Sequence, residues 1–559
     1  MPSNGPRWAA SYGPGVPLQL EHGDTTLTDQ LDATVARWGD KQAFDFLGAG
    51  TTWAQVGDQV HRVAEGLRRL GVGAGDNVAL LMPNCPQHVV AFFAVLRLGA
   101  TVVEHNPLYT AGELRHPFVD HAARVVIAWD KVVPVVQELR ATSSVEHVVA
   151  VDLTTELPLL KRLALRLPVA RARAAREQLT SPAPGAIPWD DLVASPPVAA
   201  SHSRPVADDV ALLLYTSGTT GVPKGVPLRH RNLVANVEQG CAWVPGLEQG
   251  HETFLLALPL FHAYGVTTGM LVGTSMGATL VLLPKPETGL LMEAIERKVP
   301  TFVPAVPPLY ERIVTEAERR GVSLRGIRYG LSGAMPLPAA LVERWEAATG
   351  GLLVEGYGLT ETSPVIIGNP MTHERRPGSI GVPFPDVDVR VADVDDLDRE
   401  VPLGERGELL VRGPQVFDGY RGMPQETAAA FHDGWFRTGD VVTMDERGFL
   451  TIVDRLKEMI ITGGFNVYPS EVEAVLRSHE GVLDVAVVGM PQASGSEEVV
   501  AAVVLAPGLA VLPDDLHAHA RGSLSAYKVP RRFVVVEALP VNAMGKVVRR
   551  EVAATLSHE

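Results

Sequence analysis

The strongest chemical signal in this sequence is a loop of hydroxyl, glycine and lysine residues. The loop reads Thr216-Ser217-Gly218-Thr219-Thr220-Gly221 and continues to Lys224, and the apolar segment 210–214 before it predicts a buried strand. Glycines let backbone N–H groups approach a ligand closely, and successive N–H groups bind anions. The hydroxyls add donors, and Lys224 adds a positive charge. We therefore predict a polyphosphate site, with a polar surface loop as the alternative. It is not a P-loop, because Gly225 stands where that motif has Ser or Thr.

A second motif combines an aromatic residue between glycines with a hydroxyl and a carboxylate. It reads Glu355-Gly356-Tyr357-Gly358-Leu359-Thr360-Glu361. The flanking glycines leave room for a flat base against the ring of Tyr357. Thr360 offers a hydroxyl, and Glu361 offers a hard oxygen ligand for magnesium. A strand-to-turn segment without a ligand would explain the glycines, but it would not explain the Thr-Glu pair.

The elements that must position both motifs alternate between strands and helices. A capping box over 52–55 begins a helix that Gly71 ends, and a second capping box is predicted over 470–473. The sequence predicts further strands at 78–82, 101–104, 124–129, 148–151, 254–260, 301–308, 327–331, 485–488, 499–505 and 533–536, and helices at 86–98 and 513–524. Such alternation predicts parallel sheets covered by helices.

Together the two motifs resemble those of the adenylate-forming superfamily of acyl-CoA synthetases, firefly-type luciferases and nonribosomal adenylation domains. The resemblance covers nearly the whole chain and is strongest to bacterial long-chain-fatty-acid–CoA ligases. It implies an α/β fold with a large N-terminal domain of parallel-rich sheets covered by helices, and a small β-barrel-like subdomain. It also implies a small mobile α+β C-terminal domain. The expected boundaries are 1–454 for the large domain, 455–457 for a hinge and 458–559 for the small domain.

The resemblance also assigns roles to particular residues. It implies that Lys546, Thr360 and Glu361 are catalytic, and that Thr216 and Glu361 hold Mg²⁺. A glycine before a lone lysine near a C-terminus, as at 545–546, is otherwise usually a solvated loop. The residues that the resemblance implies bind ATP or AMP are Thr216, Ser217, Gly218, Thr219, Thr220, Gly221, Lys224, Ser332, Gly333, Ala334, Glu355, Gly356, Tyr357, Gly358, Thr360, Asp440, Ile452, Arg455 and Lys546.

The acyl pocket and the coenzyme A channel are implied in the same way. The pocket residues are His262, Tyr264, Gly265, Gly269, Val306 and Gly333. A histidine such as His262 is more often a core residue. Lys457 would be the pivot between domains, and Gly463, Gly464 and Phe465 would lie beside the channel. Amino-acid adenylation domains carry an aspartate near this pocket, and segment 261–265 has no carboxylate, so an amino-acid substrate is disfavoured.

Segment 262–283 contains no charged residue and is long enough to cross a membrane. Gly265, Gly269, Gly273 and Gly277 recur every four residues, as in close transmembrane packing. Because threonines dilute the apolar character and Pro284 ends the segment, we favour a buried helix followed by a strand. A glycine face inside a domain would leave empty volume for a ligand tunnel.

Composition narrows the functional classes. The chain has 559 residues, a net charge of −15 and only two cysteines. The acidic balance argues against nucleic-acid binding, and two cysteines imply no disulfide framework, which fits a reducing cytoplasm. The first twenty residues lack the apolar core of a signal peptide. We expect a cytoplasmic enzyme, and the sequence leaves a homodimer open.

Segment 157–176 is an exception to the acidic balance, because it holds six basic residues and no acidic residue. One interpretation is a weak contact with anionic membrane at the inner face. The other is a solvated surface helix shortened by Pro158 and Pro168, which we favour slightly.

The resemblance implies ATP-dependent activation of a fatty acid to acyl-AMP, with release of pyrophosphate, followed by transfer to coenzyme A. Small molecules (the acid, ATP and CoA) are the expected partners, with Mg²⁺ as the metal. One competing hypothesis is a fatty-acyl-AMP ligase that passes the acyl group to a carrier protein, although no extra insertion is evident. The sequence also leaves open an aryl or other carboxylic acid–CoA ligase, a luciferase-like oxygenase and a non-catalytic fatty-acid-binding protein.

Overall fold

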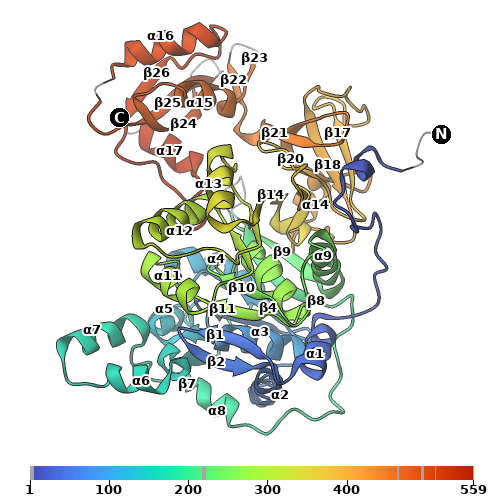
Figure 1. The fold of residues 1–559 in the computed structure, drawn as a ribbon. Helices are drawn as coiled ribbons and strands as arrows, with labels where there is room; N and C mark the ends of the chain where they lie inside the picture. Colours follow the sequence, from blue (N-terminus) through green and yellow to red (C-terminus); the bar gives the residue numbers. More distant parts are fainter. Residues whose placement is uncertain (1–4, 217–221, 463–464, 493–496, 510, 558–559) are drawn as a thin grey trace. The chain divides into compact units, whose positions relative to one another are not determined.

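The computed structural model describes residues 5–216, 222–462, 465–492, 497–509 and 511–557. The chain divides into two compact units (Figure 1). Unit 1 comprises Met1–Asp388 and Arg412–Phe431, and unit 2 comprises Val389–Val411 and His432–Glu559. Residues 389–411 and 432–454 therefore group with the C-terminal part of the chain. A division into compact units does not locate a hinge, so the hinge at 455–457 stays a prediction.

The first large sheet of unit 1 has seven strands in the order β7-β6-β5-β3-β4-β8-β9. Its strands are β3 (Asn77–Leu81), β4 (Thr101–Glu104), β5 (Val125–Trp129), β6 (His147–Val151), β7 (Ile187–Pro188), β8 (Val210–Thr216) and β9 (Lys224–Arg229). All neighbouring pairs are parallel except β8 and β9, which form an antiparallel hairpin at the edge. The strands predicted from the sequence are confirmed here to within a residue or two.

The second large sheet of unit 1 has nine strands in the order β16-β15-β14-β13-β12-β10-β11-β1-β2. Its strands are β1 (Gln42–Phe46), β2 (Ala49–Thr52), β10 (Thr253–Leu256), β11 (Thr279–Leu282), β12 (Phe302–Ala305), β13 (Tyr329–Ser332), β14 (Leu352–Gly358), β15 (Val365–Gly368) and β16 (Val382–Pro383). The run from β14 to β1 is parallel, and the antiparallel pairs lie at the two edges.

Helices cover both large sheets, as the alternation predicted (Figure 1). They include α1 (Leu27–Trp38), α2 (Trp53–Arg69), α3 (Pro86–Arg97), α4 (Ala111–His121), α9 (His230–Trp243), α11 (Thr288–Arg297), α12 (Pro307–Arg320) and α13 (Ala339–Thr349). The capping box predicted for α2 is confirmed, because the side chain of Thr52 accepts the Gln55 N–H while the Gln55 side chain accepts the Thr52 N–H. The helix ends at Arg69, and Gly71 adopts a positive φ.

The uncharged segment 262–283 is buried inside unit 1. It forms a π-helix (Tyr264–Leu271), α10 (Val272–Ser275) and then β11, as the buried interpretation predicted. None of the helices in the described part of the chain has the length and apolar content that a membrane crossing requires.

The glycines of this segment do not leave empty volume, so that expectation was wrong. A Cβ atom at Gly269 would lie 2.9 Å from the Leu256 side chain, and one at Gly273 would lie 2.5 Å from that of Leu280. The glycines instead let the helix approach β10 and β11 closely, which a residue with a side chain would prevent.

Unit 2 combines a curled five-stranded sheet with a small α+β part (Figure 1). The curled sheet contains β17 (Asp388–Ala392), β18 (Gly407–Arg412), β19 (Phe431–His432), β20 (Trp435–Met444) and β21 (Leu450–Arg455). The α+β part contains β22 (Ile460–Thr462), β23 (Phe465–Val467), α15 (Pro469–Arg477), β24 (Val482–Pro491), β25 (Glu497–Leu505), α16 (Pro513–Ser523), β26 (Arg532–Val535) and α17 (Arg549–Leu556). The fold class predicted from the sequence is confirmed.

The capping box predicted over 470–473 does not form. Pro469 occupies the first turn of α15, so the helix begins before Ser470 and has no side-chain cap. The backbone N–H of Ser470 donates to the Asp454 carboxylate at 2.9 Å. The Glu473 carboxylate accepts from Arg549 at 2.8 and 2.9 Å instead. A tertiary ion pair thus replaces the local contact that the spacing suggested.

Candidate active site

The two ends of the predicted phosphate loop meet at the β8–β9 hairpin, where Thr216 pairs with Lys224. Ser217, Gly218, Thr219, Thr220 and Gly221 lie outside the described residues. The Lys224 Nζ atom lies 4.8 Å from the ring centroid of Tyr420, and the Tyr420 hydroxyl donates to Glu361 Oε1 at 2.9 Å. Tyr420 therefore joins the lysine of the first motif to the carboxylate of the second.

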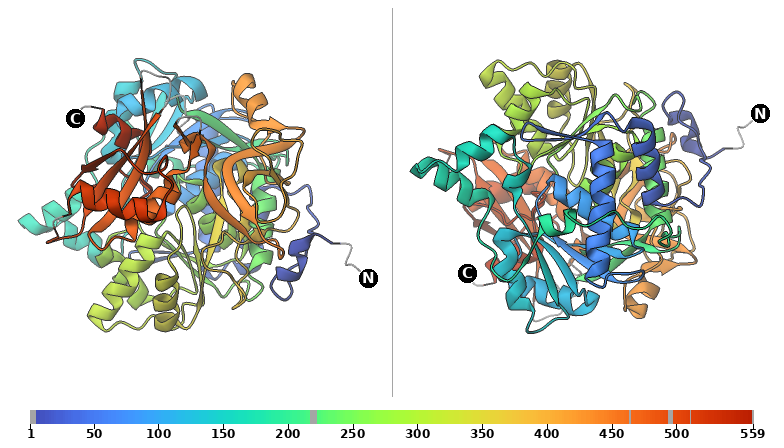
Figure 2. Two further views of the ribbon diagram at one scale, coloured as in Figure 1. Left: turned by 90° about the horizontal axis from the view of Figure 1, so that it is seen from above. Right: turned by 90° about the horizontal axis from the view of Figure 1, so that it is seen from below.

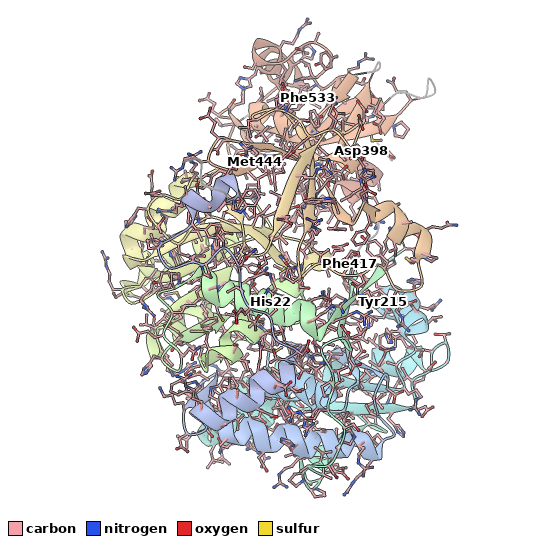
Figure 3. The ribbon with its side chains drawn as sticks, turned by 90° about the vertical axis from the view of Figure 1, so that its right-hand side faces the viewer. His22, Tyr215, Asp398, Phe417, Met444 and Phe533 are labelled. Atoms are coloured by element: carbon pink, nitrogen blue, oxygen red, sulfur yellow. The ribbon has the colours of Figure 1, made fainter. Side chains whose placement is uncertain are left out.

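The segment that carries Tyr420 is fastened to both motifs. The Phe417 N–H donates to the Glu361 carbonyl at 2.9 Å, and the Arg421 N–H donates to the Gly225 carbonyl at 2.9 Å. Figure 3 labels Phe417 and also Tyr215, the residue of β8 that precedes Thr216. Residues 417–421 thus form one wall of this part of unit 1.

Glu361 can serve as the protein's ligand for a magnesium ion. Its side chain is buried and accepts one hydrogen bond, and Thr360 and Thr216, both half-buried, offer hydroxyls. No group of three or more His, Cys, Asp or Glu residues in the described part of the chain could hold a metal. A single carboxylate fits Mg²⁺, because this ion commonly binds through one or two carboxylates plus substrate phosphates.

The predicted adenine-side turn follows β13. Ala334 has a φ of 66°, the left-handed conformation of a tight turn, and the buried Ser332 hydroxyl has no partner among the described residues. A Cβ atom at Gly333 would lie 3.0 Å from the ring of Tyr264 and 3.6 Å from the Gly356 carbonyl. The structure thus brings Gly333 to the point where the predicted nucleotide residues meet the predicted acyl pocket.

Tyr357 and its neighbours lie on β14, directly beside this turn. Tyr357 is nearly buried and pairs with Ile367 of β15, while Gly358 is exposed and leads into the short helix Thr360–Thr362. A Cβ atom at Gly358 would overlap the Pro364 carbonyl. Gly358 is therefore required by backbone packing, whether or not a base lies against Tyr357.

Glu355 has a perturbed carboxyl group at the same end of β14. Burial raises its pKa from 4.5 to about 7, and the Leu337 N–H donates to its Oε2 at 3.2 Å. Protonation of Glu355 therefore favours the folded protein. This stabilisation is complete below pH 4.5 and is lost as the pH rises through about 7.

We expect Glu355→Gln to flatten the dependence of the melting temperature on pH between pH 5.5 and 8.5. A tenfold change in proton affinity corresponds to about 1.4 kcal/mol, so the wild type should lose roughly 2 kcal/mol over this range. Glu343→Gln, at an exposed position of α13, is the matched control and should leave the profile unchanged. An equally steep profile in Glu355→Gln would contradict the assignment. Differential scanning calorimetry gives the measurement.

His262 and Val306 are two of the residues predicted for the acyl pocket. Burial lowers the pKa of His262 to about 4, so the imidazole is neutral near pH 7. The Tyr264 N–H donates to His262 Nδ1 at 3.2 Å, which leaves the proton on Nε2. Val306 is buried and caps the start of α12. The Tyr264 hydroxyl donates to the backbone carbonyls of Leu331 and of Ala305, so it is occupied by the sheet.

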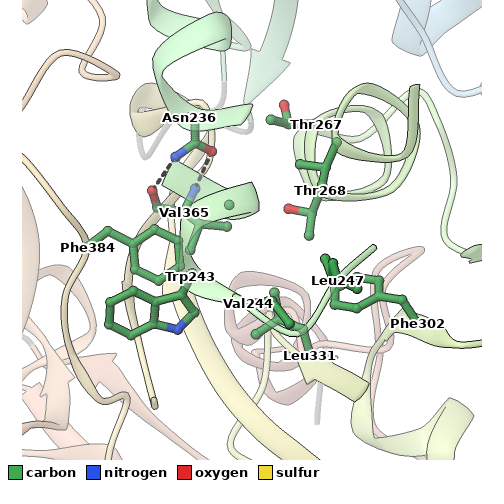
Figure 4. Close-up of a pocket in the computed structure, with 12 residues that line it drawn as sticks. Asn236, Trp243, Val244, Leu247, Thr267, Thr268, Phe302, Leu331, Val365 and Phe384 are labelled. Carbon is green, nitrogen blue, oxygen red and sulfur yellow. Dashed lines mark hydrogen bonds between the residues drawn. The ribbon is translucent and has the colours of Figure 1, made fainter. Parts of the chain in front are cut away.

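An apolar cavity of about 20 Å³ lies between α9, the buried helix and the nine-stranded sheet (Figure 4). It is lined by Asn236, Gly240, Trp243, Val244, Leu247, Thr267, Thr268, Val272, Phe302, Leu331, Val365 and Phe384. Its volume is close to that of one water, so an acyl chain could enter only if side chains move apart. The cavity adjoins Thr267, Thr268 and Val272 of the buried helix, and its lining includes none of the six residues predicted for the acyl pocket.

Three predicted residues meet within unit 2. Arg455 Nε lies 2.7 Å from Asp440 Oδ1, and the buried Asp440 pairs with Arg455 at one end of the β20–β21 ladder. Burial and the nearby Arg455 lower the pKa of the half-buried Lys546, while Glu458 and Asp440 oppose this shift. The sequence assigned these residues to three separate motifs, and the fold gathers them. Ile452 lies on β21 and is exposed.

The predicted hinge and channel residues are described only in part. Lys457 lies in the short helix Leu456–Glu458, immediately after β21. Phe465 begins β23, and Gly463 and Gly464 lie outside the described residues.

Comparison with known proteins identifies the family of this chain. The family described as AMP-binding enzyme matches residues 31–421, and the AMP-binding enzyme C-terminal domain matches residues 471–546. The chain belongs to the AMP-binding enzyme family. The resemblance stated from the sequence motifs is therefore confirmed.

Individual members of the family are similar over nearly their full lengths. A long-chain-fatty-acid–CoA ligase of Bacillus subtilis is 36% identical over 558 residues, which is 97% of each chain. A feruloyl-CoA synthase of an Amycolatopsis species is 37% identical and covers 90% of this chain and 94% of its own. The ATP-bound structure of MatB from Rhodopseudomonas palustris matches with a TM-score of 0.81 and 29% identity, over 95% of this chain and 99% of that one.

The contribution of Tyr420 to this AMP-binding enzyme was missed by sequence reasoning. It lies about sixty residues after Glu361, in a segment with no glycine-rich or hydroxyl-rich pattern, and only its position between Gly419 and Arg421 singles it out. Asn236 was missed as well. Its side chain bonds both the N–H and the carbonyl of Val365 beside the cavity (Figure 4).

Proposed function

We propose that this enzyme activates a fatty acid with ATP and transfers the acyl group to coenzyme A. The full-length match to a curated long-chain-fatty-acid–CoA ligase carries this proposal. The apolar cavity supports it, because no Asp, Glu, Lys or Arg lines the cavity to pair with a charged substrate group. ATP–pyrophosphate exchange with a panel of acids, followed by addition of CoA, tests it. Exchange with amino acids but not with fatty acids would contradict it.

In the first step, a carboxylate oxygen of the acid attacks the α-phosphorus of ATP. An O–P bond forms, the bond to pyrophosphate breaks, and negative charge builds on the phosphoryl oxygens. We propose that Lys546 meets this charge and that Thr360 and the loop from Thr216 to Lys224 donate hydrogen bonds to the phosphates. A magnesium ion held by Glu361 and Thr216 would neutralise phosphate charge when bound.

The remaining nucleotide contacts follow from where the residues lie. We propose that the base lies against Tyr357, beside the turn formed by Ser332, Gly333 and Ala334. Asp440 would accept the ribose hydroxyls, and Arg455, its ion-pair partner at 2.7 Å, would hold its carboxylate in place and reach the nucleotide.

In the second step, the thiol of CoA attacks the acyl carbonyl. A C–S bond forms, AMP leaves with the electrons of the C–O bond, and the thiol proton is released. We propose that residues 458–559 turn about Lys457 between the two steps, so that Gly463, Gly464 and Phe465 replace Lys546 at the site. A carrier protein is the alternative acceptor of the acyl group. In that case, an assay with CoA as the only acceptor would give no thioester.

An aryl acid is the second candidate substrate. Trp243, Phe302 and Phe384 contribute aromatic rings to the cavity wall, and the rings of Trp243 and Phe384 stack at 4.3 Å between centroids. The similar feruloyl-CoA synthase acts on an aromatic acid according to its name. Inclusion of cinnamic-type acids in the exchange panel separates the two candidates.

We expect Gly240→Val to shift the preference towards shorter acids. A Cβ atom at Gly240 would lie 3.2 Å from Val272, on the wall of the cavity, so added methyl groups would fill space that a longer chain needs. The ratio of exchange rates for octanoate and palmitate measures the shift. Gly273→Ala is the matched control, because it packs against Leu280 and Phe254 and should lower only the melting temperature. An unchanged ratio in Gly240→Val would exclude this cavity as the acyl pocket.

The partners of the proposed reaction are small molecules, with no nucleic acid. A weak contact with anionic membrane and a homodimer are proposed in addition, and sedimentation velocity of the purified protein tests the dimer.

A further inference from the structure

A helical hairpin of unit 1 carries almost no buried surface of its own. It consists of α6 (Leu159–Leu165) and α7 (Ala170–Leu179), and neither helix contains a buried residue. Figures 1 and 2 show the hairpin extending from the edge of the seven-stranded sheet, next to β7. Helices of 7 and 10 residues are marginally stable in water without tertiary packing. Burial of side chains therefore does not explain why the hairpin is present.

The base of the hairpin is nevertheless firmly attached to the body of unit 1. The Trp129 indole N–H donates to the Leu179 carbonyl at 2.8 Å, and Lys131 Nζ donates to the Glu177 carbonyl at 2.6 Å. The Thr180 hydroxyl donates to the buried carboxylate of Asp130. Lys161 Nζ donates to the Leu47 carbonyl at 2.9 Å. The hairpin is thus held at its base and presented to the surroundings at its tip.

The hairpin exposes large apolar side chains from the start of α6 to the turn before α7. Leu159 is 68% exposed and Leu160 is 80% exposed. The remaining exposed members are Leu163, Leu167 and Val169. Leu159, Leu160 and Leu163 fall on one side of α6, and the last two lie in the turn before α7. Five large apolar side chains exposed within one short segment indicate an interaction site, because soluble proteins rarely expose apolar side chains at this density.

The same hairpin also carries exposed basic side chains. Arg166, Arg171, Arg173 and Arg176 are exposed, and none of them forms an ion pair with a residue in the described ranges. Residues 157–176 contain six basic and no acidic side chains, and Glu177 is the single acidic residue of the two helices, although the whole chain has a net charge of −15. The hairpin is therefore positively charged although the whole protein is acidic. A partner that matches it must offer negative charge next to an apolar region.

We propose that the α6–α7 hairpin binds anionic phospholipid membranes, with its leucines inserted among the acyl chains and its arginines against the headgroup phosphates. Apolar side chains flanked by arginines are the pattern of a helix that lies in the membrane interface. An acidic protein partner would satisfy the arginines, but it would need a complementary apolar pocket for five scattered side chains. The inference rests on the proposed function in one respect: membrane binding would bring the enzyme to a membrane-soluble acid substrate.

Co-sedimentation of the full-length protein with vesicles tests the proposal. Vesicles of phosphatidylcholine with about 30% phosphatidylglycerol should bind the protein, and vesicles of phosphatidylcholine alone should bind it at least about tenfold more weakly. Raising the salt to about 0.5 M should weaken the binding, because the Debye length shortens. Equal binding to both vesicle types, or binding to neither, would overturn the proposal.

Two sets of variants separate the apolar and the charged contributions. Combined Arg166→Gln, Arg171→Gln and Arg173→Gln should lower the partition coefficient about 100-fold, since each basic residue near an anionic surface contributes roughly fivefold. Combined Leu159→Ser and Leu160→Ser should lower it at least about tenfold and make the residual binding more salt-sensitive. The matched controls, Leu512→Ser and Arg521→Gln, change exposed residues of unit 2 and should bind as the wild type does.

Activity and oligomeric state are measured on the same samples. Pyrophosphate exchange with dissolved octanoate should be unchanged in all variants, so a loss of exchange would report on the proposed function and not on the hairpin. Vesicle binding is measured without ATP or acid and is therefore independent of catalysis. A leucine variant that sediments as a smaller particle without vesicles would show that a second copy covers the leucines, and it would overturn the membrane assignment.

Discussion

Lys546→Ala should lower the rate of ATP–pyrophosphate exchange by roughly 100-fold or more. Loss of one preorganised donor to a developing oxyanion costs about 2.7–4 kcal/mol, and we expect a similar loss if Lys546 meets the transferring phosphoryl group as proposed. Within unit 2 the half-buried Lys546 lies near the ion pair of Asp440 and Arg455. Its partial burial strengthens its effect on a nearby anion, because water screens the charge less.

Thioester formation provides the contrast. Formation of acyl-CoA from supplied acyl-AMP should change less than about threefold in Lys546→Ala, because that step transfers no phosphoryl group. Lys528→Ala is a matched control in the same unit, where Lys528 pairs with Glu471 at 2.6 Å, and it should leave exchange nearly intact. If Lys546→Ala lowers both half-reactions equally, Lys546 is not specific to the first step.

Glu361→Gln should also lower exchange by about 100-fold, and it should raise the magnesium concentration needed for half-maximal rate. The amide keeps the size of the side chain but removes the negative charge that a hard divalent cation requires. Exchange measured as a function of magnesium concentration, at a fixed ratio of ATP to enzyme, separates these two effects.

Tyr420→Phe separates the role of the Glu361 carboxylate from that of the Tyr420 hydroxyl that donates to it. It removes only the hydroxyl that donates to Glu361 at 2.9 Å, so exchange should fall at most about tenfold. The two variants together test whether Tyr420 acts through Glu361, since Tyr420→Phe should then have little further effect in a Glu361→Gln background. Exchange within about threefold of the wild type in Glu361→Gln would remove Glu361 from the site.

The parts of the fold that the sequence predicted well are those set by local patterns. Strand β4 has the predicted bounds of Thr101 and Glu104, because a buried parallel strand is a short apolar run between turn residues. The capping box of α2 formed as expected. The box predicted at Ser470 did not, because Pro469 and the ion pair of Glu473 with Arg549 override the local pattern.

The candidate site divides in the same way. Motif residues such as Glu361 and Asp440 were named from the sequence, but the contact of Lys224 with Tyr420 joins segments about two hundred residues apart, which no local pattern encodes. The prediction that the glycine face of the buried helix leaves empty volume was wrong for a related reason. Spacing shows that the glycines share a face, but only the neighbouring strands decide whether that face is empty or filled.

The return of Arg412–Phe431 to unit 1 has a consequence for synthesis of the chain. Unit 1 includes this segment although residues 389–411 belong to unit 2. Its wall beside Glu361 and Gly225 therefore cannot be completed until residue 421 has left the ribosome, after all strands of both large sheets have emerged. A nascent chain that stops at Asp388 would expose the bare edge of the β8–β9 hairpin and the side chain of Glu361. Such a fragment should depend on chaperones, whereas one that ends after Phe431 should keep unit 1 intact.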